Sequence, residues 1–134
     1  MRWKDDFKQE FDLIYKIVKD EYSDIKYPCY GGRFYWFLVS RYFEELYFYL
    51  TQSSLIYTSG GYISKIPFSK IRKLSVKQGL LVKSSFHVRI VADKKYHFII
   101  KRVNYLSTKL TGDNAYNVKL FIDTLQSNVY NKKQ

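Results

Sequence analysis

The chain has 134 residues and a formal net charge of +11 at pH 7, from 23 Lys and Arg against 12 Asp and Glu. This length suits one domain, and the single Cys excludes an intramolecular disulfide and an all-cysteine metal site. Aromatic residues make up 19% of the chain, whereas Gly and Pro number only six and two, which excludes a disordered or low-complexity sequence.

No stretch approaches the roughly 20 apolar residues that a membrane-spanning helix needs, and no apolar signal region follows Met1. We therefore expect a cytoplasmic protein without a transmembrane segment. The positive charge is concentrated after residue 30, because residues 31–134 contain 17 basic and 5 acidic residues. Such a field attracts anionic lipid, nucleic acid or an acidic protein surface. The alternative is a solvated basic surface with no partner.

Apolar residues at helical spacing predict an amphipathic helix from about Trp3 to Ile25. We expect its apolar stripe to pack on the rest of the same chain; pairing with a second copy through Phe7 and Phe11 is the alternative. Pro28 and the glycine pair that follows predict a linker over residues 27–32. Residues 1–30 are thus expected to form a helix and linker packed on a domain of residues 31–134.

The apolar run Arg33–Ser40 predicts a first strand covered on both faces, with the N-terminal helix as the cover. Residues 41–45 would turn the chain into a hairpin. A two-residue turn at Gln52-Ser53 would set Leu50 opposite Leu55 and Phe48 opposite Tyr57, so that one face is apolar. That face predicts the core residues Leu46, Phe48, Leu50, Leu55 and Tyr57.

The second half of the chain predicts a loop over residues 58–61, then Pro67 at a strand edge. A strand with one basic face follows from Ile71, and a short strand from Leu80 to Lys83. A loop at residues 93–95 would join two further strands, with Ile90 opposite Phe98 and Val88 opposite Ile100. Asp113 or Asn114 can cap a last helix from about Ala115 to Asn128.

This order predicts an α+β, mainly β fold and resembles the pleckstrin-homology (PH) superfold, a seven-stranded barrel capped by a C-terminal helix. Short motifs resemble its bacterial PH-like and GRAM-like branch over about residues 33–128. They are Tyr49-Leu50-Thr51, Leu55-Ile56-Tyr57, Ile66-Pro67-Phe68-Ser69-Lys70-Ile71 and Tyr96-His97-Phe98.

The resemblance implies a binding module without catalytic activity, a cofactor or a metal. We expect it to contact an anionic membrane surface, as a peripheral protein, or a protein partner. The candidate contact residues are basic side chains of the later strands: Lys70, Arg72, Lys73, Lys77, Arg89 and Lys101.

Phosphoinositide-binding PH domains are similar in placing basic residues on the first two strands and the loop between them. Arg33 and Arg41 match two of these places. Glu44 and Glu45 depart from the pattern, because two carboxylates would repel an inositol phosphate.

Groups that could carry catalysis are few. His87 and His97 are the only histidines and are expected on one exposed face, with His97 opposite Val91, too far from other ligands for a zinc site. Nothing around Cys29 resembles a nucleophile motif. Two alternatives remain besides the membrane: self-assembly through the N-terminal helix, and nucleic-acid binding with Tyr47 and Tyr49 as exposed stacking residues.

Overall fold

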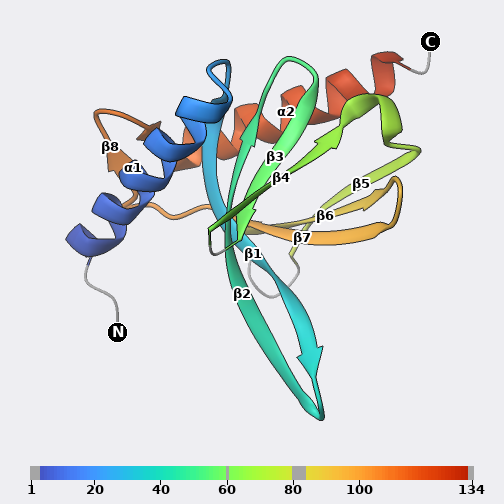
Figure 1. The fold of residues 1–134 in the computed structure, drawn as a ribbon, viewed down its shortest axis with the longest axis horizontal. Coiled ribbons are helices and arrows are strands. Elements are labelled where there is room, and N and C mark those ends of the chain that lie inside the picture. The colour runs from blue at the N-terminus through green and yellow to red at the C-terminus, as the bar shows by residue number, and fades with distance from the viewer. Residues whose placement is uncertain (1–3, 60, 80–83, 133–134) are drawn as a thin grey trace.

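The computed structural model describes residues 4–59, 61–79 and 84–132. Its main feature is one antiparallel sheet of seven strands between two helices, α1 (Lys4–Glu21) and α2 (Asn114–Lys132) (Figure 1). The fold is therefore α+β and mainly β, as predicted.

The sheet has the strand order β4-β3-β2-β1-β7-β6-β5. A 3-10 turn, η1 (Phe68–Lys70), lies between the two edge strands, and a small ladder of β8 (Ser107–Thr108) and β9 (Gly112–Asp113) precedes α2. The bounds of the main strands are β1 (Lys26–Phe37), β2 (Ser40–Leu50), β3 (Ser54–Ser59), β4 (Tyr62–Pro67), β5 (Lys73–Gln78), β6 (Ser85–Val91) and β7 (Lys95–Lys101).

The sheet is not closed into a barrel. Within the described ranges no backbone pairing joins β4 to β5, because η1 carries the chain from one edge to the other without bringing the two strands into register. The expectation of a closed barrel is corrected to an open sheet with two edges.

The larger core lies between the inner face of the sheet and α2, which packs chiefly against β1. All five predicted core residues are buried here, and Leu50 pairs with Leu55 and Phe48 with Tyr57, so this register is confirmed. The backbone N–H of Ala115 donates to Asp113 Oδ1 at 3.2 Å, which confirms the predicted cap of α2. The helix extends to Lys132, beyond the predicted Asn128.

A second core lies on the outer face of the sheet, beneath α1. Phe7, Phe11 and Val18 are buried there, and their cluster includes Tyr47 and Tyr49. The helix thus packs on its own chain. Tyr47 and Tyr49 are not the exposed stacking residues that were expected, because the helix covers them.

Strand β1 begins earlier than predicted. The helix ends at Glu21, and residues 27–32 are part of the strand and not a linker. The proline and the two glycines of this segment have a different use: the register shifts between Lys26 and Cys29, where Tyr27 has a φ of 57°. At Gly31 a Cβ would overlap the carbonyl oxygen of Ile99 on β7.

Residues 33–44 form a two-stranded arm that extends from the sheet (Figure 1). Strand β1 pairs with β7 only as far as Gly32, and β2 pairs with β3 only from Tyr47, so the segment between pairs with itself. Two predictions are wrong here. The apolar run of residues 33–40 is not covered by a helix, and residues 41–45 are strand and not turn; the turn is Leu38-Val39.

The later strands are shifted relative to the prediction. Strand β4 begins directly after the loop expected at residues 58–61, where the sequence predicts no strand, so the basic strand that follows is the fifth of the sheet. Pro67 ends this edge strand, as expected. The β6–β7 hairpin sets Ile90 opposite Tyr96 and Val88 opposite Phe98, because Ala92 belongs to the turn, where its N–H donates to the Lys94 carbonyl. Residues 1–3, 60 and 80–83, including the short strand predicted at Leu80 to Lys83, lie outside the described residues.

Candidate binding surface

A cleft of about 800 Å³ lies between the base of the arm and the outer face of β5, β6 and β7. The arm contributes Phe34 and Phe43, and Ile99 of β7 adds a third apolar side chain. The remaining described lining residues are polar or basic: Ser75, Lys77, Gln78, Gly79, Ser85, His87, Arg89 and Lys101.

The basic character of the cleft follows from strand periodicity. Side chains alternate between faces, so Leu74 and Val88 enter the core while Lys77 and Arg89 lie on the outer face. Lys101, at the end of β7, places its Nζ 4.4 Å from the centroid of the Phe43 ring, a cation–π contact. None of the described lining residues is acidic, so these cations set the charge of the cleft.

The structure brings together three of the six predicted contact residues, namely Lys77, Arg89 and Lys101. The other three lie toward the opposite end of β5. Lys73 begins that strand, Lys70 ends η1, and the Arg72 guanidinium donates to the Ala92 carbonyl at 3.1 Å. The predicted basic face therefore separates into a cleft group and an η1 group.

The two histidines are closer than predicted. His87 Nδ1 and His97 Nε2 lie 2.9 Å apart in a hydrogen bond, because the register places His97 opposite Arg89 and not opposite Val91. Burial, followed by the charge of Arg89, holds the pKa of His97 below its ordinary value of 6.5. His87 and Arg41 act in the same direction. His97 is thus neutral at pH 7.

No protein-family model and no curated protein matches this sequence. The case for a function therefore comes from the geometry of the chain's own residues.

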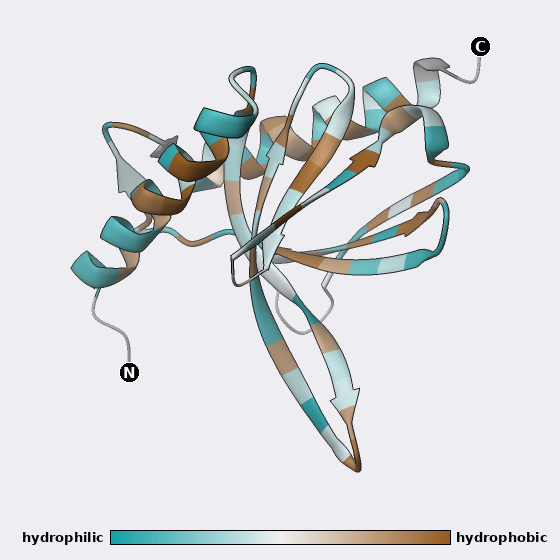
Figure 2. Cartoon of the chain, viewed as in Figure 1, coloured by the Kyte–Doolittle hydropathy of each residue, from teal (hydrophilic) through white to brown (hydrophobic). Residues whose placement is uncertain are grey.

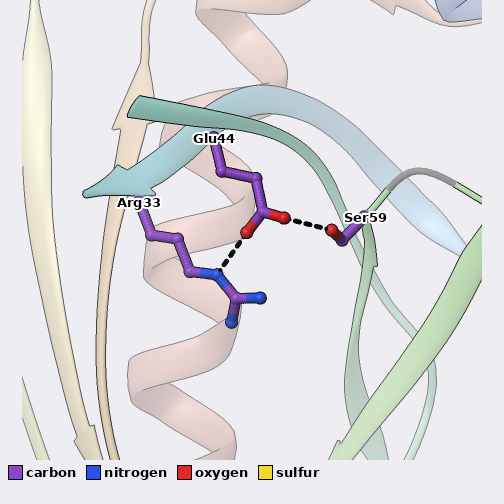
Figure 3. A network of polar contacts seen from close by, with 3 residues as sticks. All are labelled: Arg33, Glu44 and Ser59. Carbon is purple, nitrogen blue, oxygen red and sulfur yellow. Dashed lines mark hydrogen bonds and ion pairs between the residues drawn. The ribbon is translucent and has the colours of Figure 1, made fainter. Parts of the chain in front are cut away.

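A polar network lies at the root of the arm (Figure 3). Arg33 Nε donates to Glu44 Oε1 at 2.6 Å, and Ser59 Oγ donates to Glu44 Oε2 at 2.5 Å. The hydrogen bond from Ser59, and then that from Arg33, lower the pKa of Glu44 below its ordinary value of 4.5. Arg33 is engaged by this carboxylate, so the two opposite charges neutralise each other at the root of the arm.

The single cysteine lacks the environment of a nucleophile. Burial raises the pKa of the Cys29 thiol, whereas a nucleophilic cysteine needs a lowered one. No three His, Cys, Asp or Glu side chains gather into a metal site anywhere in the described ranges. Within those ranges neither helix has the length and apolarity to cross a bilayer.

The exposed side chains of the arm are a feature that the sequence prediction missed. Phe34 and Phe43 are 5.1 Å apart across the two strands, and Tyr35 stacks on Tyr42 at 5.7 Å. Beyond them the hairpin ends in apolar residues, which Figure 2 shows in brown at its tip. An apolar run predicts burial, and a turn of Leu and Val carries no turn signal, so this sequence offered nothing to indicate exposure.

Proposed function

We propose that the chain is a PH-like binding module, without catalytic activity, that contacts an anionic membrane surface through its basic cleft. The strand order, with β1 between β2 and β7, and the helix after the seventh strand support the PH-like assignment. The raised pKa of Cys29 argues against this thiol as a nucleophile.

The observation that carries the proposal is the convergence of Lys77, Arg89 and Lys101 on one concave surface without a described acidic neighbour in its lining. A basic residue close to an anionic bilayer contributes roughly 1 kcal/mol. Three together therefore contribute about 3 kcal/mol, which suits reversible attachment.

Two other functions receive less support. Self-assembly through Phe7 and Phe11 would need those side chains at an interface, but they are buried within the chain. Nucleic-acid binding through Tyr47 and Tyr49 has the same difficulty. An acidic protein surface would use the same cleft residues as the membrane.

Cosedimentation with lipid vesicles tests the proposal. The protein should sediment with vesicles of phosphatidylglycerol and phosphatidylcholine in equal parts, and not with phosphatidylcholine alone. Replacing Lys77, Arg89 and Lys101 by Gln together should weaken binding by roughly 100-fold, since each 1.4 kcal/mol is a factor of about ten.

The matched control replaces Lys65, Lys109 and Lys119 by Gln, because these residues are exposed or lie at the surface and do not line the cleft. This variant has the same net charge as the cleft variant. Equal losses in the two variants would show a diffuse charge effect and contradict the proposal, as would equal binding to neutral vesicles. A protein that does not bind vesicles but retards an oligonucleotide at low salt would favour nucleic acid as the partner.

A further inference from the structure

The tip of the arm exposes four consecutive large apolar side chains. Trp36 is 70% exposed, Phe37 61%, Leu38 86% and Val39 91%. None of the four belongs to either core, since the two cores lie under α1 and α2. Contiguous exposed apolar surface of this kind marks an interaction site in a folded protein.

The conformation of the turn indicates that these side chains serve an intermolecular contact and do not stabilise the hairpin. Phe37 pairs with Ser40, so Leu38-Val39 is a two-residue hairpin turn, and Leu38 has a φ of 58°. Such turns favour Asn or Gly, because a bulky side chain at positive φ is strained. The hairpin would be more stable with a polar turn than with the one it has.

Polarity changes in order along the arm. The aliphatic pair Leu38-Val39 is at the tip, Trp36 and Phe37 come next, and the stacked Tyr35 and Tyr42 follow. The last cross-strand pair before the sheet is the ion pair of Arg33 with Glu44. Aliphatic, aromatic and then charged is the order that a bilayer presents from its hydrocarbon through its interface to its head groups.

Arg41 fits the same order. It pairs with Trp36 near the tip, but its guanidinium carbon lies 3.9 Å from the centroid of the Phe34 ring, toward the base of the arm. A long basic side chain that turns back toward the polar side is typical of the membrane interface.

We propose that the arm inserts its tip, Trp36 to Val39, into the interfacial layer of an anionic bilayer. Two residues of extended strand span about 7 Å, so the end of β1 from Trp36 to the turn matches the roughly 5–10 Å depth of an interfacial segment. Phe34 and Phe43 also line the basic cleft, so insertion holds Lys77 and Arg89 near the head groups. This inference rests on the proposed membrane function and adds an apolar component to it.

Fluorescence of Trp36 tests insertion directly. The sequence has two tryptophans, so Trp3→Phe leaves Trp36 as the only one in these 134 residues. On vesicles of equal parts phosphatidylglycerol and phosphatidylcholine, its emission should shift to shorter wavelength and be quenched by acyl-chain-brominated phosphatidylcholine. Binding to these vesicles with unchanged emission would overturn the inference while leaving the cleft proposal intact. Failure to bind would overturn both.

A tip variant separates insertion from folding. Leu38→Asn with Val39→Gly supplies favoured turn residues, so its melting temperature should equal or exceed that of the wild type. Its affinity for anionic vesicles should fall by at least about tenfold, because two exposed aliphatic side chains are lost. Leu13→Asn is the matched control, since Leu13 is exposed on α1 and outside the arm.

Two results with these variants would overturn insertion. One is an unchanged affinity of the tip variant. The other is a Trp36 emission that shifts with protein concentration in the absence of lipid, together with a larger mass in analytical ultracentrifugation. If the tip variant abolishes both changes, the arm binds a second copy of the chain and not a bilayer.

Discussion

At the scale of single residues, the charge of the cleft depends on which groups are protonated. Lys77, Arg89 and Lys101 are the basic side chains that line it. His97 lies beside Arg89 and its hydrogen-bond partner His87, and its lowered pKa keeps it neutral at pH 7. The outer face of the sheet can therefore gain positive charge when the pH falls.

Vesicle binding should strengthen as the pH falls from neutral through the lowered pKa of His97. Protonation adds a positive charge near Arg89 and Arg41, and bound anionic lipid favours the protonated form. Cosedimentation across this range should show a smaller increase for His97→Gln than for the wild type. An equal increase in both proteins would show that other groups cause the change.

The same shift affects stability. The folded pKa of His97 lies below the ordinary value of 6.5, so the unfolded chain binds more protons between the two values. The free energy of unfolding should therefore fall as the pH decreases through this window and stop falling, for this group, below the folded pKa. Urea unfolding of His97→Gln should lack that contribution.

At this scale the sequence predicts which side chains face outward but not which of them meet. Alternation in β5 and β6 is enough to place Lys77 and Arg89 on one face. The contact between His87 and His97 depends on the pairing of two strands, and the turn between them shifted that pairing by two residues. A shift of two residues leaves each side chain on the same face of the sheet, but it changes which residues lie opposite each other.

At the scale of elements, β1 is the central strand of the sheet and joins its two halves. It pairs with β2 along its length and with β7 near its middle, and α2 packs against it. Gly31 and Gly32 lie where β7 approaches, and a side chain at Gly31 would meet the backbone of Ile99. A backbone carbonyl cannot move aside to make room for a Cβ, whereas the end of a flexible side chain can.

Gly31→Ala should accordingly lower the free energy of unfolding by about 1–3 kcal/mol, the usual cost of overpacking. Gly61→Ala is its control, because a Cβ there meets nothing within 4 Å. Urea unfolding of the two variants measures the difference. Similar effects in both would mean that the close approach of β1 to β7 does not limit stability.

Element prediction succeeded where hydrophobic pattern and turn chemistry agree. The Phe48 hairpin has alternating apolar residues around a polar two-residue turn, and its register is confirmed. In residues 33–44 the two signals conflict, since a continuous apolar run surrounds an apolar turn. The glycine pair predicts a break in the chain from sequence alone, because its use, close contact with β7, depends on a residue 68 positions away, Ile99.

At the scale of the whole molecule, the two helices cover different parts of the sheet. Helix α2 closes the inner face, whereas α1 covers the outer face over Tyr30, Tyr47 and Tyr49. The outer face of β5 to β7 carries the cleft instead of a helix. The position of α1 therefore determines which half of the outer surface is available for binding.

If α1 packs on the sheet of its own chain, the stability of this contact should not depend on protein concentration. Phe7→Leu with Phe11→Leu should lower the melting temperature, with each substitution costing roughly 1 kcal/mol. The loss should be the same over a wide range of protein concentration. A melting temperature that rises with concentration would instead indicate an interface between copies. Leu13→Ala, on the exposed side of the helix, is the control.

The arm also determines how the molecule is oriented on a surface. From Cys29 to Phe37 the pairing of β1 with β2 continues without a register shift, so the same ribbon runs from the core to the tip with no bulge to act as a hinge. Anything that holds the tip thereby fixes the direction of the central strands. Helix α2 lies at the other end of the molecule and then faces away from that surface (Figure 1). One short turn can thus set which side of the protein stays open to further partners.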